Sequence, residues 1–289
     1  MKVAIYYPSW SSNWSSTIDG FDLSQIDKKY PGLTCVYIAF VRPDLSYVSG
    51  SKTFANTGLE FSTGFGVVKG AIDVLKSRGI CVMLSVGGGA YWSVDKKFNV
   101  QNLVDLTSDL GVDGLDIDFE MPGKAKDLTN CIRNLRAAYK GYISFAGWST
   151  GAYPDDGSYS GSALDAIKSV GNLVDAINIM AYDAGDKYDP QQAYQAYRSV
   201  YSGPLLLGFE TGNPGWGGYV LTAADVVRNV GFMKKQRNDD GIFVWCDKKD
   251  GTPSPQDVIK AVGFNTTPPP PPPLVMQIIC PQCKTVFKK

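Results

Sequence analysis

The sequence contains no histidine, and its charges cancel, with 28 basic and 28 acidic residues. The missing histidine excludes a Ser-His-Asp triad, a Cys-His pair and imidazole ligands for zinc. The zero net charge gives no electrostatic reason to expect nucleic acid or an anionic membrane as a partner. Acid–base chemistry must therefore fall to carboxylates, tyrosine, lysine or cysteine.

Cysteine is also scarce, with six residues in a chain of 289. Cys35, Cys81 and Cys246 lie in or beside predicted strands, where a free thiol packs as a small apolar group. The spacing is not that of a small disulfide-rich secreted domain. No apolar run is long enough to span a membrane, and no apolar leader precedes the first predicted strand. Three localisations stay open: the protein stays in the cytoplasm, it leaves by a non-classical route, or a leader has been removed.

Apolar residues make up 44% of the chain, which is enough for one α/β barrel of about 250 residues. Eight apolar segments alternate with helical ones. The expected strands are Val3–Tyr7, Cys35–Val41, Cys81–Val86, Gly114–Phe119, Tyr142–Gly147, Ala176–Ala181, Leu205–Phe209 and Ile242–Trp245. This alternation predicts a single (β/α)8 TIM barrel. A doubly wound open sheet is disfavoured because no glycine fingerprint for phosphate opens the first helix.

The composition changes after residue 264, so we expect residues 1–264 to form the barrel. Residues 265–273 include an unbroken proline run, which favours a stiff, extended linker. Residues 274–289 form a short tail with Cys280 and Cys283 in a CxxC spacing. Because a zinc site needs four ligands, two cysteines indicate a disordered tail or part of a truncated second domain. The proline run fits a partner ligand as well as a linker.

Three carboxylates occupy alternate positions of the fourth predicted strand: Asp116, Asp118 and Glu120. Residues two apart in a strand share a face, so these side chains point the same way. Like charges at that spacing repel and burial disfavours their ionised forms, so at least one pKa should rise. A raised carboxyl pKa is what a general acid near neutral pH requires. The alternative is a solvated acidic face, which the apolar residues on the other side of the strand disfavour.

With Asp113, these residues form Asp113-x-x-Asp116-x-Asp118-x-Glu120, which resembles the DxxDxDxE signature of family 18 glycoside hydrolases, the chitinases and their relatives. Ser85–Gly88 resembles the family's SxGG motif, and Met180–Asp183 is similar to its MxYD motif. Trp245 ends the eighth predicted strand, where the family places a tryptophan under the scissile sugar. The resemblance covers the chain from Val3 to about Phe264.

The resemblance implies a retaining, substrate-assisted mechanism, in which the substrate's own 2-acetamido oxygen attacks the anomeric carbon. Glu120 would be the general acid, and Asp118 would stabilise the oxazolinium ion. Asp116 would share a proton with Asp118, and Tyr182 would hold the acetamido oxygen. Asp113 lies outside the alternation, and we expect it to be structural. The remaining substrate-binding candidates are Trp245, Asp183, Tyr7, Phe40, Gly87, Gly88 and Met180.

The implied function is endo-hydrolysis of β-1,4-linked N-acetylglucosamine polymers by a monomer, with no cofactor and no metal. The alternatives are an endo-β-N-acetylglucosaminidase acting on N-glycans, a non-catalytic chitin-binding relative, and a Mg²⁺-dependent barrel enzyme. Phe119 and Met121 flank the acid where the family often has tryptophan and tyrosine. The segment between Phe209 and Ile242 is too short for the α+β insertion of many relatives, which indicates a shallow groove. The loop tryptophans that would line it are Trp10, Trp14, Trp92 and Trp216.

Overall fold

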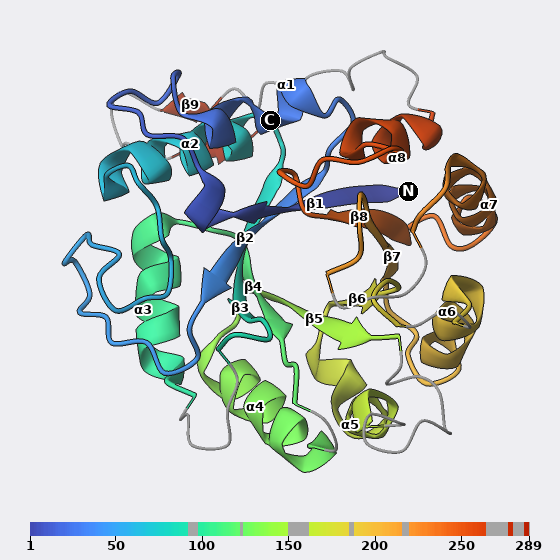
Figure 1. Cartoon of the computed structure of the whole chain (residues 1–289). Helices are drawn as coiled ribbons and strands as arrows, with labels where there is room; N and C mark the ends of the chain where they lie inside the picture. The colour runs from blue at the N-terminus through green and yellow to red at the C-terminus, as the bar shows by residue number, and fades with distance from the viewer. Residues whose placement is uncertain are drawn as a thin grey trace.

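The computed structural model describes residues 1–91, 98–121, 124–149, 162–184, 188–215 and 220–263, and the short strands 277–279 and 286–288. Eight parallel strands close into a barrel in chain order, which confirms the predicted TIM barrel (Figure 1). The strands are β1 (Lys2–Pro8), β2 (Cys35–Val41), β3 (Cys81–Gly87), β4 (Gly114–Asp118), β5 (Tyr142–Trp148), β6 (Ala176–Met180), β7 (Leu205–Glu210) and β8 (Gly241–Trp245). All eight strands are those expected from the sequence, with ends that differ by at most one residue.

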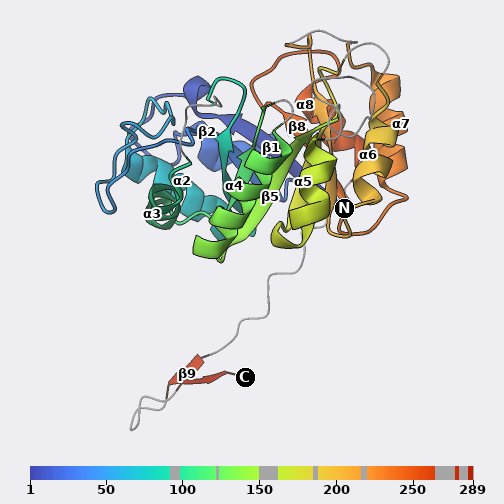
Figure 2. The same cartoon turned by 90° about the horizontal axis from the view of Figure 1, so that it is seen from below.

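Helices surround the barrel (Figure 1). They are α1 (Ile26–Lys29), α2 (Phe65–Ser77), α3 (Val100–Leu110), α4 (Ala125–Ala138), α5 (Ser162–Val170), α6 (Pro190–Arg198), α7 (Ala223–Met233) and α8 (Pro255–Ala261). The helices α4 and α5 pack side by side next to β5 (Figure 2). The sequence did not predict α1 or the short 3-10 helices Ser9–Ser11, Asp22–Gln25 and Gly171–Leu173, because four residues or fewer give no helical period.

Local signals explain several helix ends. Thr222 and Ser254 form capping boxes with Asp225 and Asp257, which satisfy backbone N–H groups at the starts of α7 and α8. Gly111 ends α3 with φ of 70°, a left-handed conformation that glycine adopts without steric cost. The chain can therefore turn sharply from α3 into β4, the strand that carries the carboxylates.

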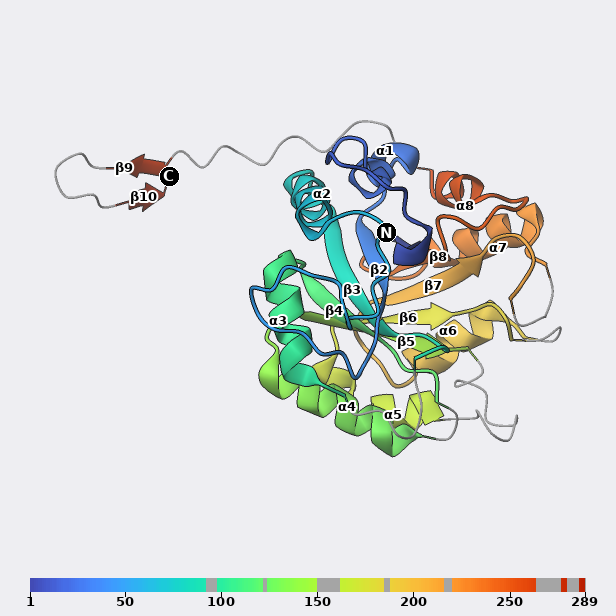
Figure 3. The ribbon, with the colours of Figure 1, turned by 60° about the vertical axis from the view of Figure 1, so that its left-hand side comes forward.

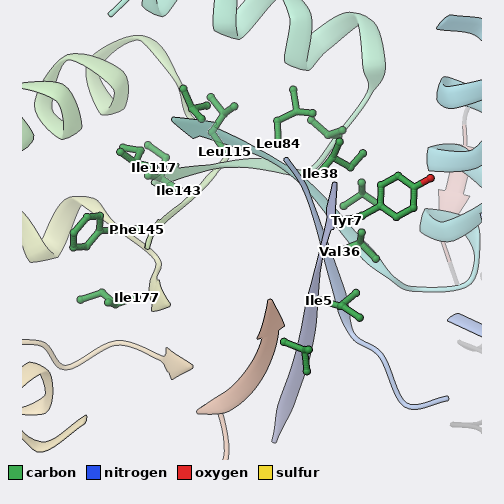
Figure 4. Close-up of a cluster of buried hydrophobic side chains, with 14 of the residues drawn as sticks. Ile5, Tyr7, Val36, Ile38, Leu84, Leu115, Ile117, Ile143, Phe145 and Ile177 are labelled. Carbon is green, nitrogen blue, oxygen red and sulfur yellow. The ribbon is translucent and has the colours of Figure 1, made fainter. Parts of the chain in front are cut away.

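Alternation along the strands creates two cores. The outer core lies between barrel and helices and contains Ile5, Ile38, Leu84, Leu115 and Ile117 (Figure 4). The inner core fills the barrel with the side chains that point the other way, and its buried members are Ala4, Tyr6, Tyr37, Ala39, Met83, Ala146, Ala176, Met180, Leu206 and Phe243. Because β4 gives Leu115 and Ile117 to the outer core, it must present Asp116 and Asp118 to the barrel interior.

Between β7 and β8, the described residues 211–215 and 220–240 form α7 and no strand. This confirms the expected absence of an α+β insertion within the described part of that segment. Near the C-terminus, Gln277–Ile279 (β9) and Val286–Lys288 (β10) pair as an antiparallel ribbon (Figure 3). The proline run, Cys280 and Cys283 lie outside the described residues, so the linker and tail assignments stay predictions. None of the helices in the described ranges combines the length and the hydropathy that crossing a bilayer requires.

Candidate active site

Asp116 lies at the centre of the barrel and is fully buried. Its Oδ1 accepts hydrogen bonds from Ser144 Oγ at 2.6 Å and Asn178 Nδ2 at 3.2 Å. Its Oδ2 accepts from the Tyr6 hydroxyl and from Ser85 Oγ, both at 2.8 Å. Burial raises the pKa of Asp116, and these four neutral donors act in the opposite direction. Four different strands therefore hold one carboxylate in a fixed position.

Asp118 ends β4 one step closer to the mouth of the barrel and is 4% exposed. Burial raises its pKa well above the usual range, and the negative charges of Glu120 and Asp116 add to the rise. Its backbone carbonyl accepts a hydrogen bond from the Gly88 amide at 3.0 Å, which joins the ends of β3 and β4. A positive charge that develops beside this carboxyl would favour its ionised form.

Glu120 follows β4 and is partly exposed at the mouth. Burial raises its pKa, and the nearby Asp183 charge contributes to the rise. Two hydrogen bonds to the carboxylate act in the other direction, one from Trp148 Nε1 at 3.2 Å and one from the Gly89 backbone amide. Glu120 thus combines a raised pKa with access from solvent, the two properties that a proton donor to a bound substrate requires.

Tyr182 follows β6, and several acidic residues of the site lie close enough to affect the pKa of its phenol. Burial raises the pKa of its phenol well above the usual range, and the charges of Asp118, Glu210, Glu120 and Asp183 add to that rise. Its hydroxyl therefore stays protonated and keeps a hydrogen-bond donor beside the row of carboxylates. The structure therefore brings Tyr182 close to the predicted residues Asp118, Glu120 and Asp183.

Glu210, at the end of β7, was not a predicted site residue. It is nearly buried and forms an ion pair with Lys249. Burial raises its pKa to about 7, Lys249 lowers it, and the charge of Asp183 and a hydrogen bond with that side chain raise it. Asp183 has a φ of 53°, a conformation uncommon for residues other than glycine. The signal for Glu210 was present in the sequence, since Leu205–Glu210 ends an apolar strand in a carboxylate, as Gly114–Asp118 does.

A row of aromatic rings extends from the mouth of the barrel. Trp245 stacks on Phe40 with centroids 5.5 Å apart, and Phe40 stacks on Trp10 at 6.0 Å, both with interplanar angles of 25°. Trp245 also meets Tyr6 edge-on at 5.6 Å, which joins the row to the Asp116 cluster. Trp10 is 47% exposed and Trp14 is 70% exposed. The other two loop tryptophans, Trp92 and Trp216, lie outside the described residues.

The glycines after β3 make room for these groups. A Cβ on Gly88 would come within 2.7 Å of the Phe40 ring, and its φ of 76° favours glycine. Gly89 lies beside Glu120, whose carboxylate oxygens are 3.6 Å from the place a Cβ would occupy. Gly87 also has positive φ, at 118°. These contacts give Gly87 and Gly88 a role in packing and backbone geometry, while their predicted contact with substrate stays a prediction.

At Tyr7 the structure differs from the sequence prediction. Tyr7 is fully buried in the outer core, and its hydroxyl donates to Asp22 Oδ1. The side chain of Tyr6 points inward instead and donates to Asp116. The alternation of β1 is the reason, because adjacent residues of a strand face opposite sides. The sequence proposed the correct strand end but the wrong one of two adjacent tyrosines.

The structure also places two other predicted residues, Met180 and Asp113. Met180 packs in the inner core at the end of β6, close to the mouth. Asp113 precedes β4 at the opposite end of the barrel, where it accepts from the Val82 amide at 2.9 Å and pairs with Lys76 at 2.9 Å. This placement agrees with the structural role expected for Asp113.

Ser144, Asn178 and Trp148 were not named as site residues from the sequence, although each touches a carboxylate of β4. They lie on β5 and β6, so only closure of the barrel brings them to Asp116 and Glu120. A polar residue inside an apolar strand, as in Tyr142–Trp148 or Ala176–Met180, is the signal that points to such a partner.

The arrangement suits proton transfer to and from a bound molecule. Within the described ranges, no three Asp, Glu or Cys side chains are grouped so as to hold a metal ion. A partly exposed carboxyl, a buried carboxyl with a raised pKa and a protonated phenol surround one end of the barrel. Together they offer one bound molecule a proton donor, a carboxyl that can ionise beside a developing positive charge, and a hydrogen-bond donor.

Comparison with known proteins adds to this geometry. The profile of the glycosyl hydrolases family 18 matches residues 2–214. Chitinase 1 of Aphanocladium album is 26% identical over 236 residues, which cover 70% of this chain and 52% of that protein. This chain spans between 34% and 52% of the length of five curated relatives that it matches.

Two solved structures share the fold with a TM-score of 0.67. A GH18 chitinase from Pseudoalteromonas aurantia is 22% identical, with 91% of this chain and 98% of that chain covered. A fungal endo-β-N-acetylglucosaminidase of the same family is 20% identical, with 90% and 98% covered. Likeness at this identity shows the barrel, and the profile match over residues 2–214 shows the family. The chain belongs to family 18 of the glycosyl hydrolases.

Proposed function

We propose that the chain is a retaining endo-hydrolase of β-1,4-linked N-acetylglucosamine polymers that uses the substrate's acetamido group as nucleophile. The observation that carries the proposal is the row formed by Asp116 and Asp118 on β4 and Glu120 just after it, with Tyr182 close to Asp118 and Glu120. No second carboxylate needs to attack the sugar in this mechanism, because the substrate supplies that group.

Glu120 is the proposed general acid. Its raised pKa keeps a fraction of the carboxyl protonated near neutral pH, and its position at the mouth lets it reach the glycosidic oxygen. After the leaving group departs, the same carboxylate takes a proton from the attacking water. Trp148 and the Gly89 amide hold it in place between these two steps.

Asp118 is proposed to hydrogen-bond the acetamido N–H and to stabilise the oxazolinium ion. The negative charges of Glu120 and Asp116 raise its pKa in the free protein, so a developing positive charge beside it is strongly favoured. Tyr182 would donate to the acetamido oxygen and align it with the anomeric carbon. The network around Asp116 refines the earlier expectation of a shared proton, because four donors already occupy its oxygens. We infer that Asp116 acts mainly as a fixed negative charge beneath Asp118.

Substrate contact is assigned to the aromatic row and to Asp183. Phe40 stacks on both Trp245 and Trp10, so the apolar faces of pyranose rings would stack on the parts of the two tryptophans that Phe40 does not cover. The described segment between β7 and β8 adds no strand that would deepen the site. Both features support an open groove that accepts an internal segment of a polymer.

The test is the stereochemistry and selectivity of hydrolysis. Chitotetraose, cellotetraose and a high-mannose glycopeptide are incubated separately with the protein, and the first-formed anomer is followed by proton NMR, with and without EDTA. We expect cleavage of chitotetraose with initial formation of the β-anomer, no cleavage of cellotetraose, and no effect of EDTA. An α-anomer or cleavage of cellotetraose would contradict the mechanism. Cleavage of the glycopeptide alone would identify N-glycans as the substrate. Binding without turnover would indicate a chitin-binding protein. Loss of activity in EDTA would indicate a metal enzyme.

A further inference from the structure

Two cysteines begin neighbouring strands at the end of the barrel opposite the carboxylates. Cys35 is the first residue of β2 and Cys81 is the first residue of β3. The strands are parallel, and these two residues are direct partners in the register. Neighbouring strands lie about 4.8 Å apart, which is within the roughly 4.4–6.8 Å between Cα atoms that a disulfide spans.

Their side chains point the same way. Both pack against the inner core, next to Tyr37 and Met83, and side chains directed to the axis of a closed barrel converge. Each thiol shifts the pKa of the other, which places the two sulfurs close together, and both cysteines are free and partly exposed. The other described cysteines lie elsewhere, Cys131 buried in α4 and Cys246 directly after β8.

The charges around the pair make the two thiols unequal. The hydrogen bond with Cys35 lowers the pKa of Cys81, and the ammonium groups of Lys2 and Lys76 act in the same direction. Burial and the Asp113 charge oppose that shift. Burial raises the pKa of Cys35, and its bond to Cys81 adds to the rise, which fits a thiol that donates its proton to its neighbour. Cys81 is therefore the more readily ionised thiol of the pair.

We propose that Cys35 and Cys81 form a reversible thiol–disulfide site that exchanges with a small disulfide such as oxidised glutathione. The Cys81 thiolate attacks one glutathione sulfur, forms a mixed disulfide and releases a glutathione thiolate. Cys35 then gives its proton to a thiolate or to water and attacks the Cys81 sulfur, which releases the second glutathione. Two protein thiols are oxidised and one glutathione disulfide is reduced to two thiols.

The disulfide would link β2 to β3 and close a loop that contains the residues between positions 35 and 81. Closing a loop of that length restricts the unfolded chain, so the oxidised protein should unfold at a higher temperature. The site lies at the end of the barrel away from Glu120, and its proposed chemistry does not depend on the hydrolase activity. Failure of the hydrolysis test would leave it unaffected.

The experiment uses the full chain and a variant, Cys280→Ser/Cys283→Ser, that removes the tail thiols. Each is equilibrated with oxidised glutathione, blocked with N-ethylmaleimide, digested without reduction and mapped by mass spectrometry. We expect a linked peptide pair containing Cys35 and Cys81 in both proteins. We also expect a rise of at least about 5 °C in the unfolding midpoint that dithiothreitol reverses. Separate N-ethylmaleimide adducts on both cysteines, or no rise in the tail variant, would overturn the proposal.

Single variants test the order of attack. In Cys35→Ser, glutathione should stay attached to Cys81, because no resolving thiol remains. In Cys81→Ser, Cys35 should gain glutathione at least about ten times more slowly, since its raised pKa leaves less of it as the reactive thiolate. Equal rates would contradict the assigned roles. If either variant fails to fold, the peptide map of the tail variant still decides whether the pair forms.

Discussion

Two groups of buried carboxylates lie at the C-terminal end of this barrel, and they differ in what surrounds them. On β4, Asp116 is held by neutral hydroxyl and amide donors, and Asp118 has its pKa raised by burial and then by its two acidic neighbours. At the ends of β7 and β8, Glu210 pairs with Lys249, and Asp247 pairs with Lys29 at 3.5 Å.

The pKa alone does not separate the two groups. Burial raises the pKa of Glu210 to about 7 and that of Asp247 to about 6, although lysines act in the opposite direction on both. The two groups differ in the charge of the side chains that lie beside each carboxyl. An ammonium group balances the charge in the folded protein, so its loss should cost stability. A buried carboxyl beside other carboxylates has its ionised form disfavoured until a cationic intermediate forms next to it, so its loss should cost activity. The following experiments test that distinction.

The largest effect is expected from Glu120→Gln compared with Glu210→Gln. The first removes the proposed proton donor, so kcat on chitotetraose should fall by about 10²–10⁴-fold while oligosaccharide binding is kept. The second makes the same chemical change in the lysine-paired group and should lower kcat by no more than about ten-fold. Steady-state kinetics and calorimetric binding give both values. Equal losses in the two variants would remove the distinction between the groups.

Asp118→Asn should give the next largest effect. The amide keeps the shape but removes the negative charge beside the oxazolinium ion, so kcat should fall by about 10²-fold. The unfolding midpoint should stay the same or rise, because Asp118 is a buried carboxyl whose pKa is raised by like charges. Thermal unfolding and kinetics on the same preparation test this, and a destabilised but fully active variant would be the opposite of the expected result.

Lys249→Met should affect stability more than chemistry. It leaves Glu210 buried without its cation and should destabilise the fold by about 2 kcal/mol at pH 8. Loss of the ammonium raises the pKa of Glu210 further, so at pH 5 the carboxyl binds a proton and most of the cost disappears. Denaturant unfolding at the two pH values measures the difference, with Lys235→Met, at an exposed lysine, as the control. The same cost at both pH values would show that Glu210 does not titrate.

The smallest effect is expected from Trp148→Phe. The indole N–H donates to the Glu120 carboxylate and lowers its pKa, so its removal should raise that pKa. Because the proposed acid must be protonated, the alkaline limb of the kcat/KM profile should move to higher pH. A shift to lower pH would contradict the assignment of Glu120.

The sequence predicted the barrel because apolar residues recur with one spacing in the eight strands and with another in the helices between them. It predicted the β4 carboxylates because their positions alternate along one strand. It failed at Tyr7 because two adjacent tyrosines give no clue to which faces inward. The donors Ser144 and Asn178 and the Glu210–Lys249 pair depend on which strand ends meet, and only the closed barrel determines that. The α1 helix was missed because four residues hold barely one helical turn.

The central claim is that Glu120 gives a proton to the leaving group, and Glu120→Ala measured on two substrates tests it most directly. A nitrophenyl glycoside of chitobiose has a leaving group that needs little protonation, whereas chitotetraose needs it fully. The account predicts that the variant loses at least about ten times less activity on the nitrophenyl substrate than on chitotetraose. Equal losses on both substrates would contradict it.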